Sequence, residues 1–325
     1  MNKKELYFTE NNEKNIKRKA DYIKNQKYEI SKSISFLKNS IFDTDINSIL
    51  INKNDIIANF KRPNISLLIN IEDERSCSIE TINFSRYEPN DSNLILGTLS
   101  YLSNKNSKFT FFDIGANEGF YSIASINEFK NVDLHIFEAV PEIANLLNKN
   151  LKLNNIDFQK INNFALSNKN GIEKFIYVPG LSGSSSFKNL VRHESAKQID
   201  VETMTLDKYI KEKKVQPDFL KIDVEGAEKN VIEGFHNSLI LLKKKPILFI
   251  EILRKWSREF GYSATEFFKE IISYGYKCYS SCSNNTLKEC NGIDDKTIET
   301  NFLFIPDSFQ DYSELTFHIK EWQDK

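Results

Sequence analysis

The sequence predicts a doubly wound α/β sandwich, in which helices cover both faces of a mostly parallel sheet. From residue 109 onward, short apolar runs alternate with segments of helical periodicity, as in successive strand–helix units. The first run, residues 109–114, is too apolar to alternate between a buried and a solvent-facing side, which is typical of a strand covered on both faces. Right-handed crossovers then place the connecting helices on the two faces of the sheet.

The elements are expected in a regular order. Pro141 opens one helix at its first turn, and Thr205 is placed to cap the next. Two β segments, 174–178 and 200–205, lie on either side of a loop rich in serine and glycine. Helices are expected over 119–129, 141–153, 206–210, 227–235 and 264–274, and strands over 109–114, 133–138, 158–166, 218–224, 246–252, 276–280 and 301–305.

The chain is long enough for one large domain and an appendage. Residues 1–86 are expected to form an N-terminal extension of unknown role, residues 87–310 the main domain, and residues 311–325 a C-terminal helix or tail. The start of the extension is polar and rich in lysine, which is consistent with a solvated helix or with partial disorder. Short β-like runs follow at 56–60 and 66–71.

Composition limits the classes of function. The chain has 44 Lys+Arg against 45 Asp+Glu, so its charge gives no electrostatic case for binding nucleic acid or an anionic membrane surface. No apolar run approaches the ~18–20 residues that cross a bilayer, and residues 1–10 lack the apolar segment of a secretory signal. We therefore expect a cytoplasmic protein without a transmembrane segment and without a nucleic-acid partner.

Three of the four cysteines, Cys278, Cys282 and Cys290, lie close together in the sequence. Zinc requires four ligands at characteristic spacings, and neither a CxxC pair nor a nearby histidine completes such a set. So few cysteines in so long a chain also argue against a disulfide framework. We expect ordinary thiols in and around a late strand, and no metal.

The heptapeptide DIGANEG, residues 113–119, directly follows the first strand. In open α/β sheets ligands bind beyond the carboxyl ends of the strands, so this stretch is placed for a ligand loop. Gly115 permits a tight turn and a close approach to a ligand, and Gly119 lets the following helix pack against the strand. A strand-to-helix turn that binds nothing is the alternative for this stretch taken alone.

The glycine spacing distinguishes between nucleotide ligands. A dinucleotide site needs three glycines in the pattern GxGxxG, whereas Gly115 and Gly119 are in GxxxG spacing, so a ligand without a pyrophosphate fits better. Glu138 ends the next strand, where an acid accepts ribose hydroxyl groups in dinucleotide folds. An adenosine with an amino-acid tail, S-adenosylmethionine, is consistent with these features.

At these motifs the sequence resembles the FkbM-type methyltransferases, a family of class I S-adenosylmethionine-dependent enzymes. The resemblance implies a Rossmann-like class I methyltransferase sandwich with a seven-stranded, mostly parallel sheet. Ala139 departs from the family pattern, which has proline there, and Pro141 comes two residues later. The resemblance covers roughly residues 87–282 and rests on YEP at 87–89, DIGANEGFYS at 113–122, IFE at 136–138, NFALS at 163–167, SGSSSF at 182–187, TLD at 205–207, and above all LKIDVEGAE at 220–228, followed by VIEG and PILFIE.

The resemblance also implies roles for single residues. For Asn163, a capped turn after a strand is an equal alternative. Asp113, Gly115, Asn117 and Gly119 correspond to the loop around the methionine part of the donor, Glu138 to the acid on the ribose, and Asn163 and Ala165 to positions that touch the adenine.

The second long motif carries the candidate catalytic residues. Methyl transfer needs an aligned acceptor and removal of its proton, because the donor is already activated. Asp223 and Glu225 are two apart at a strand end, so on a strand both point to the same side. Glu251 ends the next strand and should converge on the same cleft, where Lys221 acts in catalysis or forms a structural ion pair. The three acids are suited to magnesium, but direct binding of acceptor hydroxyls or action as a base is favoured.

We therefore expect an S-adenosylmethionine-dependent O-methyltransferase that acts on a hydroxyl group of a small molecule or glycan, such as a sugar in a surface glycan or a secondary metabolite. The resemblance supplies this acceptor class, and the residues themselves do not. The alternatives are an N-methyltransferase and a non-catalytic nucleotide-binding or interaction module of a glycan assembly complex. A nicotinamide-dependent oxidoreductase is disfavoured by the missing third glycine.

Overall fold

The computed structural model describes residues 13–157, 161–281, 287–294 and 296–324. The chain divides after Thr44 into two compact units, rather than at residue 86 as the sequence suggested. The first unit holds one long helix, α2 (Glu13–Ser40), whose side chains are almost all exposed from residue 20 onward. The described part of the lysine-rich segment is therefore a solvated helix. No helix within the described ranges combines the length and the apolar character needed to span a membrane.

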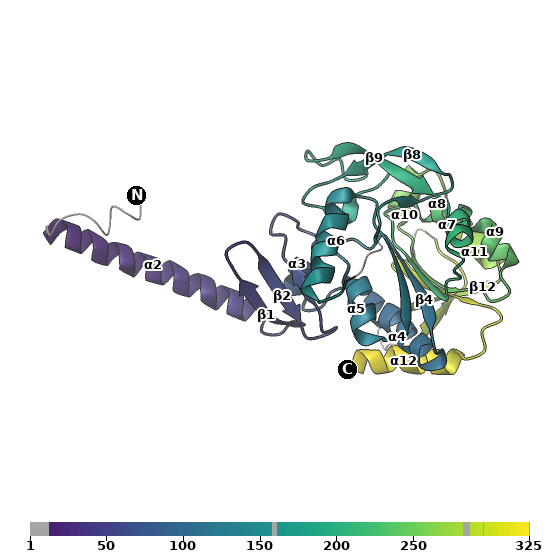
Figure 1. Ribbon diagram of the computed structural model, residues 1–325, viewed down its shortest axis with the longest axis horizontal. Helices are drawn as coiled ribbons and strands as arrows, with labels where there is room; N and C mark the ends of the chain where they lie inside the picture. Colours follow the sequence, from purple (N-terminus) through teal and green to yellow (C-terminus); the bar gives the residue numbers. More distant parts are fainter. Residues whose placement is uncertain (1–12, 158–160, 282–286, 295, 325) are drawn as a thin grey trace. The chain divides into compact units, whose positions relative to one another are not determined.

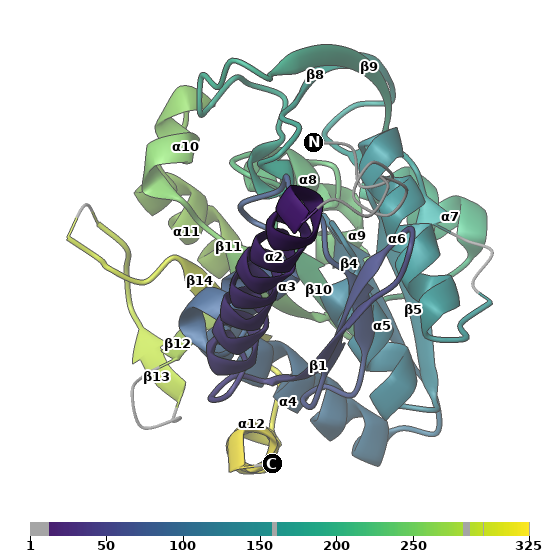
Figure 2. The ribbon, with the colours of Figure 1, turned by 90° about the vertical axis from the view of Figure 1, so that its left-hand side faces the viewer.

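The second unit (Figure 1) is built on a central sheet with the strand order β13-β12-β14-β11-β10-β4-β5-β6. The sheet consists of β4 (Phe109–Ile114), β5 (Val132–Phe137), β6 (Ile161–Asn162), β10 (Phe219–Ile222), β11 (Ile247–Glu251), β12 (Tyr276–Ser281), β13 (Leu287–Cys290) and β14 (Asn301–Pro306). β4, β5, β6, β10 and β11 run parallel, whereas β14 runs antiparallel to β11 and β12. Within the described residues the sheet has eight strands instead of the expected seven, because an unpredicted strand, β13, pairs with β12 at its edge (Figure 2).

Helices cover both faces of this sheet, as the doubly wound prediction required (Figure 1). Phe112 packs into a core with residues of α7, α8 and α11, while Phe111 points the other way and stacks on Phe219 with ring centroids 5.4 Å apart. Burial on both faces explains the unbroken apolar run of β4. The helices are α4 (Pro89–Lys105), α5 (Phe120–Glu128), α6 (Pro141–Leu153), α7 (Leu206–Lys213), α8 (Glu228–Glu233), α9 (His236–Leu241), α10 (Arg254–Glu259), α11 (Ala264–Ser273) and α12 (Tyr312–Asp324).

One expected strand, 158–166, is divided between two sheets, and residues 158–160 lie outside the described residues. β6 joins the central sheet, but β7 (Ala165–Leu166) joins a separate three-stranded sheet with β9 (Lys197–Met204) and β8 (Gly171–Tyr177). Asn163 turns the chain between β6 and β7, and its side chain donates to backbone carbonyls after β5. An apolar run alone does not reveal that its two halves pair with different partners.

Residues 45–86 belong to the second unit rather than to a separate extension. They form a small antiparallel sheet of β1 (Ile46–Ile51), β2 (Ile56–Phe60) and β3 (Ser66–Leu68), followed by α3 (Cys77–Phe84). Asn150 of α6 and Asn154, which directly follows this helix, hold β3 in place by accepting hydrogen bonds from its backbone N–H groups at 2.9 and 2.8 Å. This attachment brings the segment before α3 close to the ends of the central strands.

Candidate active site

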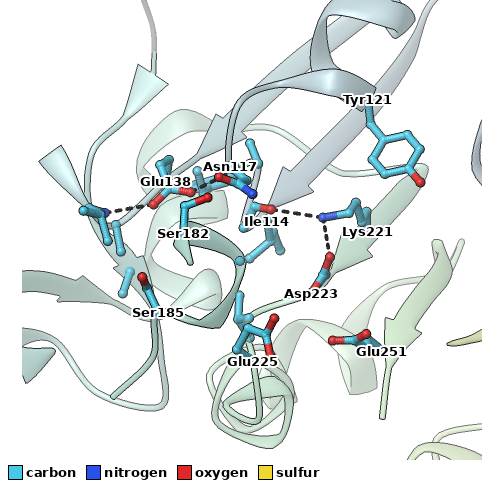
Figure 3. A pocket seen from close by; sticks show the side chains of 18 of the residues that line it. Ile114, Asn117, Tyr121, Glu138, Ser182, Ser185, Lys221, Asp223, Glu225 and Glu251 are labelled. Carbon is cyan, nitrogen blue, oxygen red and sulfur yellow. Dashed lines mark hydrogen bonds and ion pairs between the residues drawn. The ribbon is translucent and has the colours of Figure 1, made fainter. Parts of the chain in front are cut away.

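One pocket lies where the loops after β4 and β10 meet, at the carboxyl ends of these parallel strands (Figure 3). Gly115 has a φ of +77°, and a Cβ atom on it would lie 1.9 Å from the carbonyl oxygen of Asp223. Only glycine permits both this backbone conformation and this approach without displacing the second loop. Gly115 therefore allows the two loops to form one continuous wall.

Asn117 and Gly119 shape the rest of the first loop. Their φ angles are 49° and 91°, in the left-handed region that asparagine and glycine adopt more readily than other residues. A Cβ atom on Gly119 would lie 2.0 Å from Leu147 Cδ1, so this glycine lets α5 approach α6. The close packing predicted for Gly119 is therefore against α6 and not against the strand.

Glu138 follows β5 directly, and two backbone N–H groups hold its carboxylate. Asn117 N donates to Oε2 at 3.0 Å, and Val140 N donates to Oε1 at 2.9 Å. Burial raises the pKa of Glu138 to about 7, although these two hydrogen bonds act to lower it. Because each carboxylate oxygen has a second lone pair, Glu138 can brace the loop and still accept a hydrogen bond from a ligand.

Three of the residues assigned to the donor, Asp113, Gly119 and Asn163, are absent from the described lining of the pocket. Asp113 is only 1% exposed and accepts a hydrogen bond from Ser122 Oγ at 2.5 Å. Asn163 Nδ2 donates to the carbonyl oxygen of Glu138 at 2.8 Å, which matches the capped turn considered for it. Asp113 and Asn163 therefore support the loops through hydrogen bonds outside the pocket. The residues assigned to the donor that do line the pocket are Gly115, Asn117, Glu138 and Ala165.

Lys221 lies on β10 with its ammonium group at the junction of the two loops (Figure 3). Its Nζ is 3.1 Å from Asp223 Oδ2, 3.7 Å from Asp113 Oδ1 and 3.0 Å from the carbonyl oxygen of Gly115. Burial acts to lower the pKa of Lys221, but the two carboxylates outweigh it and the net shift is upward. Lys221 is therefore a permanent cation, which suits an ion-pair role better than that of a base.

Asp223 and Glu225 lie in the loop after β10, because this strand ends at Ile222. The sequence argument, in which the alternation of side chains along a strand points Asp223 and Glu225 to the same side, is therefore wrong. Glu225 has a φ of 51° and Gly226 a φ of 93°, and these two left-handed residues turn the loop back. Glu228 Oε1 holds the turn by accepting hydrogen bonds from Val224 N at 3.2 Å and Gly226 N at 3.0 Å.

Asp223, Glu225 and Glu251 nevertheless converge at one end of the pocket, as predicted (Figure 3). One carboxylate oxygen from each lies within 4.8 Å of the others. Burial, followed by the charge of Asp223, raises the pKa of both Glu225 and Glu251 well above the ordinary value for glutamate. Carboxylates in this arrangement can share protons, bind hydroxyl groups or hold a hard cation, for which they supply suitable oxygen ligands.

Glu88 is an acid of this pocket to which the sequence assigned no role. It precedes α4 in a left-handed conformation, with φ 38° and ψ 62°, and it lines the pocket together with Lys221 and Asp223. Tyr121 Oη donates to Glu88 Oε2 at 2.8 Å. Burial, with a further contribution from Asp223, raises the pKa of Glu88 to about 8. Its only signal in the sequence is the YEP motif at 87–89, which contributed to the family resemblance.

Arg75 is a second lining residue that the sequence did not indicate. It comes from the segment before α3, and its charge acts to lower the pKa of Glu225 and Glu80. Asp73 anchors the same segment by accepting a hydrogen bond from Ser182 N at 3.2 Å. Residues of the segment before α3 and of the serine-rich loop thus form one side of the pocket.

The described lining fits S-adenosylmethionine. Gly115 lines the pocket with its backbone alone, and Glu138 presents a carboxylate directly after β5. Phe164, a partly exposed aromatic side chain that lines the same pocket, offers a surface for a flat base.

A search of curated proteins finds the methyltransferase sdnD of Sordaria araneosa, which is 29% identical over an alignment of 151 residues; the match covers 38% of this chain and 58% of that protein. The chain thus spans less than two thirds of the length of this relative. A search of solved structures matches, among others, an O-methyltransferase of Bacillus cereus in complex with SAH (13% identity, 66% of this chain and 79% of that chain, TM-score 0.37) and fibrillarin of Aeropyrum pernix with natively bound S-adenosyl-L-methionine (9% identity, 80% and 99%, TM-score 0.34).

The family comparison covers the two loops that build the pocket. A model of the methyltransferase FkbM domain matches residues 113–278, which is just over half of the chain. The match begins at Asp113 and includes Glu138, Lys221, Asp223, Glu225 and Glu251. The chain therefore belongs to the FkbM methyltransferase family.

Proposed function

We propose that the protein methylates a hydroxyl oxygen, and that the hydroxyl belongs to a sugar of a surface glycan or to a secondary metabolite. The observation that supports this reaction is the convergence of Asp223, Glu225 and Glu251 beside Lys221 at one end of the pocket. A hydroxyl group needs a hydrogen-bond acceptor to orient it and a base to remove its proton, and carboxylates supply both. The cytoplasmic location expected from the sequence is part of the same proposal.

Different residues of the pocket bind the donor, position the base, remove the proton and bind the acceptor. S-adenosylmethionine, when bound, supplies the activated methyl group. Glu138 and the loop around Asn117 hold the donor, and Lys221 keeps Asp223 in a fixed orientation through their ion pair. Asp223 accepts the hydrogen bond of the acceptor hydroxyl and takes its proton as the oxygen attacks. Glu225, Glu251 and Glu88 bind the neighbouring hydroxyl groups, which polyhydroxylated acceptors such as sugars present.

A direct test uses the purified protein, isotope-labelled S-adenosylmethionine and a panel of sugars, nucleotide sugars and amines. Mass spectrometry should find a hydroxyl compound that gains one labelled methyl group, and fragmentation should place the label on oxygen. Methylation of amines alone would favour the rival N-methyltransferase. Donor binding without transfer to any extract of the producing cells would favour the non-catalytic module.

A further inference from the structure

Two cysteines of the sheet edge form a cross-strand pair outside the pocket. Cys278 on β12 and Cys290 on β13 are directly opposed Cα partners in an antiparallel ladder, and both are free thiols. Opposed residues in such a ladder have Cα atoms about 4.5–5.5 Å apart. A disulfide bridges Cα atoms about 4.4–6.8 Å apart, so the backbone already has the spacing for a bond between these sulfurs.

The two thiols differ in accessibility and in acidity. Cys278 is 1% exposed, whereas Cys290 is partly exposed and lines a shallow surface hollow with Lys288 and Gly292. A hydrogen bond from the Cys278 thiol lowers the pKa of Cys290 to about 6. Burial and the same hydrogen bond raise the pKa of Cys278. Cys290 is therefore the more accessible and the more acidic of the two thiols.

We propose that Cys278 and Cys290 are a redox modification site, at which a small disulfide such as oxidised glutathione converts the pair into an intramolecular bond. Sensor cysteines typically combine an accessible, acidic thiol with a neighbouring thiol that resolves the first product. The opposed positions on β12 and β13 provide this arrangement. Neither cysteine lines the pocket, so the inference is independent of the proposed function.

The chemistry proceeds in two exchange steps. The Cys290 thiolate attacks one sulfur of oxidised glutathione, the glutathione S–S bond breaks, and one glutathione thiolate leaves with the electron pair. The Cys278 thiol then gives up its proton to the departing thiolate and attacks Cys290 Sγ, which expels the second glutathione. Two protein thiols are oxidised to one disulfide, and one glutathione disulfide is reduced to two thiols.

The bond would change the edge of the sheet. Among the described strands, β13 pairs only with β12, so it is held by a single ladder. A covalent link between Cys278 and Cys290 would fasten this outer strand to the sheet. We expect a slower amide hydrogen exchange of β13 in the oxidised protein than in the reduced protein.

The experiment exposes the full-length protein to oxidised and reduced glutathione at fixed ratios, alkylates it under denaturing conditions and measures intact mass. A Cys282→Ser background removes the third nearby thiol, which lies outside the described residues. We expect loss of two alkylation sites, a disulfide-linked peptide pair containing Cys278 and Cys290, and full reversal by dithiothreitol. Cys77 should remain alkylated, which serves as an internal control.

Two single variants identify the order of attack, with circular dichroism as the check of folding. Cys278→Ser should stop at a mixed disulfide between glutathione and Cys290, because no resolving thiol is left. Cys290→Ser should react at least ten-fold more slowly, because Cys278 is buried. The inference is overturned if both thiols remain reduced in oxidised glutathione, or if glutathione is attached to Cys278 first. It is also overturned if, in the protein that retains Cys282, Cys282 forms a disulfide with Cys278 or Cys290.

Discussion

The ammonium nitrogen of Lys221 lies 3.1 Å from Asp223 Oδ2, and this ion pair joins the strand end of β10 to the loop that follows it. The same nitrogen lies 3.7 Å from Asp113 Oδ1, and the side chains of Lys221 and Asp113 are only 4% and 1% exposed. Lys221 thus compensates a carboxylate that water does not reach. A buried charge that loses its partner destabilises a fold strongly.

Lys221→Met should therefore lower the free energy of unfolding by about 3–5 kcal/mol, because Asp113 would remain buried without a cation. Urea unfolding followed by circular dichroism measures this change. The double variant Lys221→Met/Asp113→Asn should recover part of the loss, since it removes the uncompensated charge. Equal stability of the single and double variants would contradict this explanation.

Glu118 predicts how stability depends on pH. Its side chain is 0% exposed, and burial, followed by the charge of Asp73, raises its pKa from 4.5 to about 8. The folded protein then binds a proton between these values that the unfolded chain has lost. This contribution to stability is complete below pH 4.5 and disappears as the pH rises through about 8. We expect the free energy of unfolding to fall between pH 5 and 8.

The variant Glu118→Gln should flatten that pH dependence by up to about 1.4 kcal/mol per pH unit, because one titrating group is removed. Thermal or urea unfolding in buffers from pH 5 to 8 provides the measurement. Glu128→Gln, which changes an exposed acid of α5, should leave the slope as it is. A slope that Glu118→Gln does not alter would show that other groups cause the pH dependence.

Glu138 is the test of the donor site. If its carboxylate accepts the ribose hydroxyl groups, Glu138→Ala should weaken S-adenosylmethionine binding by about 1.5–3 kcal/mol, measured by calorimetry. Because Glu138 also accepts the backbone N–H groups of Asn117 and Val140, the folding of the variant must be checked by its melting temperature. Glu142→Ala, an exposed acid on α6, is the matched control and should bind the donor normally. Unchanged affinity in a folded Glu138 variant would refute the ribose assignment.

The sequence identified the two loops of the pocket because their chemistry is local. Gly115 has a positive φ and lies close to Asp223, and only glycine permits both in one turn. The requirement for glycine at this position is therefore visible in the short motif DIGANEG. The convergence of Glu251 follows from the parallel pairing of β10 and β11, which hydrophobic runs predict. These parts of the site required no long-range information beyond the order of the strands.

Other parts depend on contacts between segments that are distant in the sequence. Glu88 reaches the pocket because α4 packs beside α5 and Tyr121 donates a hydrogen bond to its carboxylate. The pattern of apolar residues along the sequence does not reveal this contact. Arg75 is placed by a hydrogen bond between Asp73 and the loop at Ser182, 109 residues later. The edge strand β13 was missed because it is short and partly exposed, with only a weak apolar pattern.

The acidic end of the pocket leads to a prediction about metal. Lys221 already compensates Asp223, and the raised pKa values of Glu225 and Glu251 favour bound protons over a bound cation at neutral pH. We therefore expect turnover to survive dialysis against EDTA, measured as formation of S-adenosylhomocysteine. Loss of activity in EDTA that magnesium restores would instead assign the three carboxylates to a cation.

The last prediction concerns the base. Asp223 lies at the end of β10 beside Lys221, and the proposed reaction requires a carboxylate there to take the hydroxyl proton. Asp223→Asn keeps the size of the side chain and removes its charge. It should lower kcat by roughly 10²-fold or more, as is typical when a general base is lost, while donor affinity changes far less.

Two matched variants separate Asp223 from its neighbours in the same assay. Glu225→Gln and Glu88→Gln remove the other carboxylates without a change in size, and each should mainly raise the KM for the acceptor, because these residues are assigned to binding. If the Asp223 variant turns over normally while one of these two is inactive, the base is that residue instead. If all three variants keep their kcat, none of these three carboxylates is the base, and either Glu251 is the base or alignment of the acceptor alone accounts for methyl transfer.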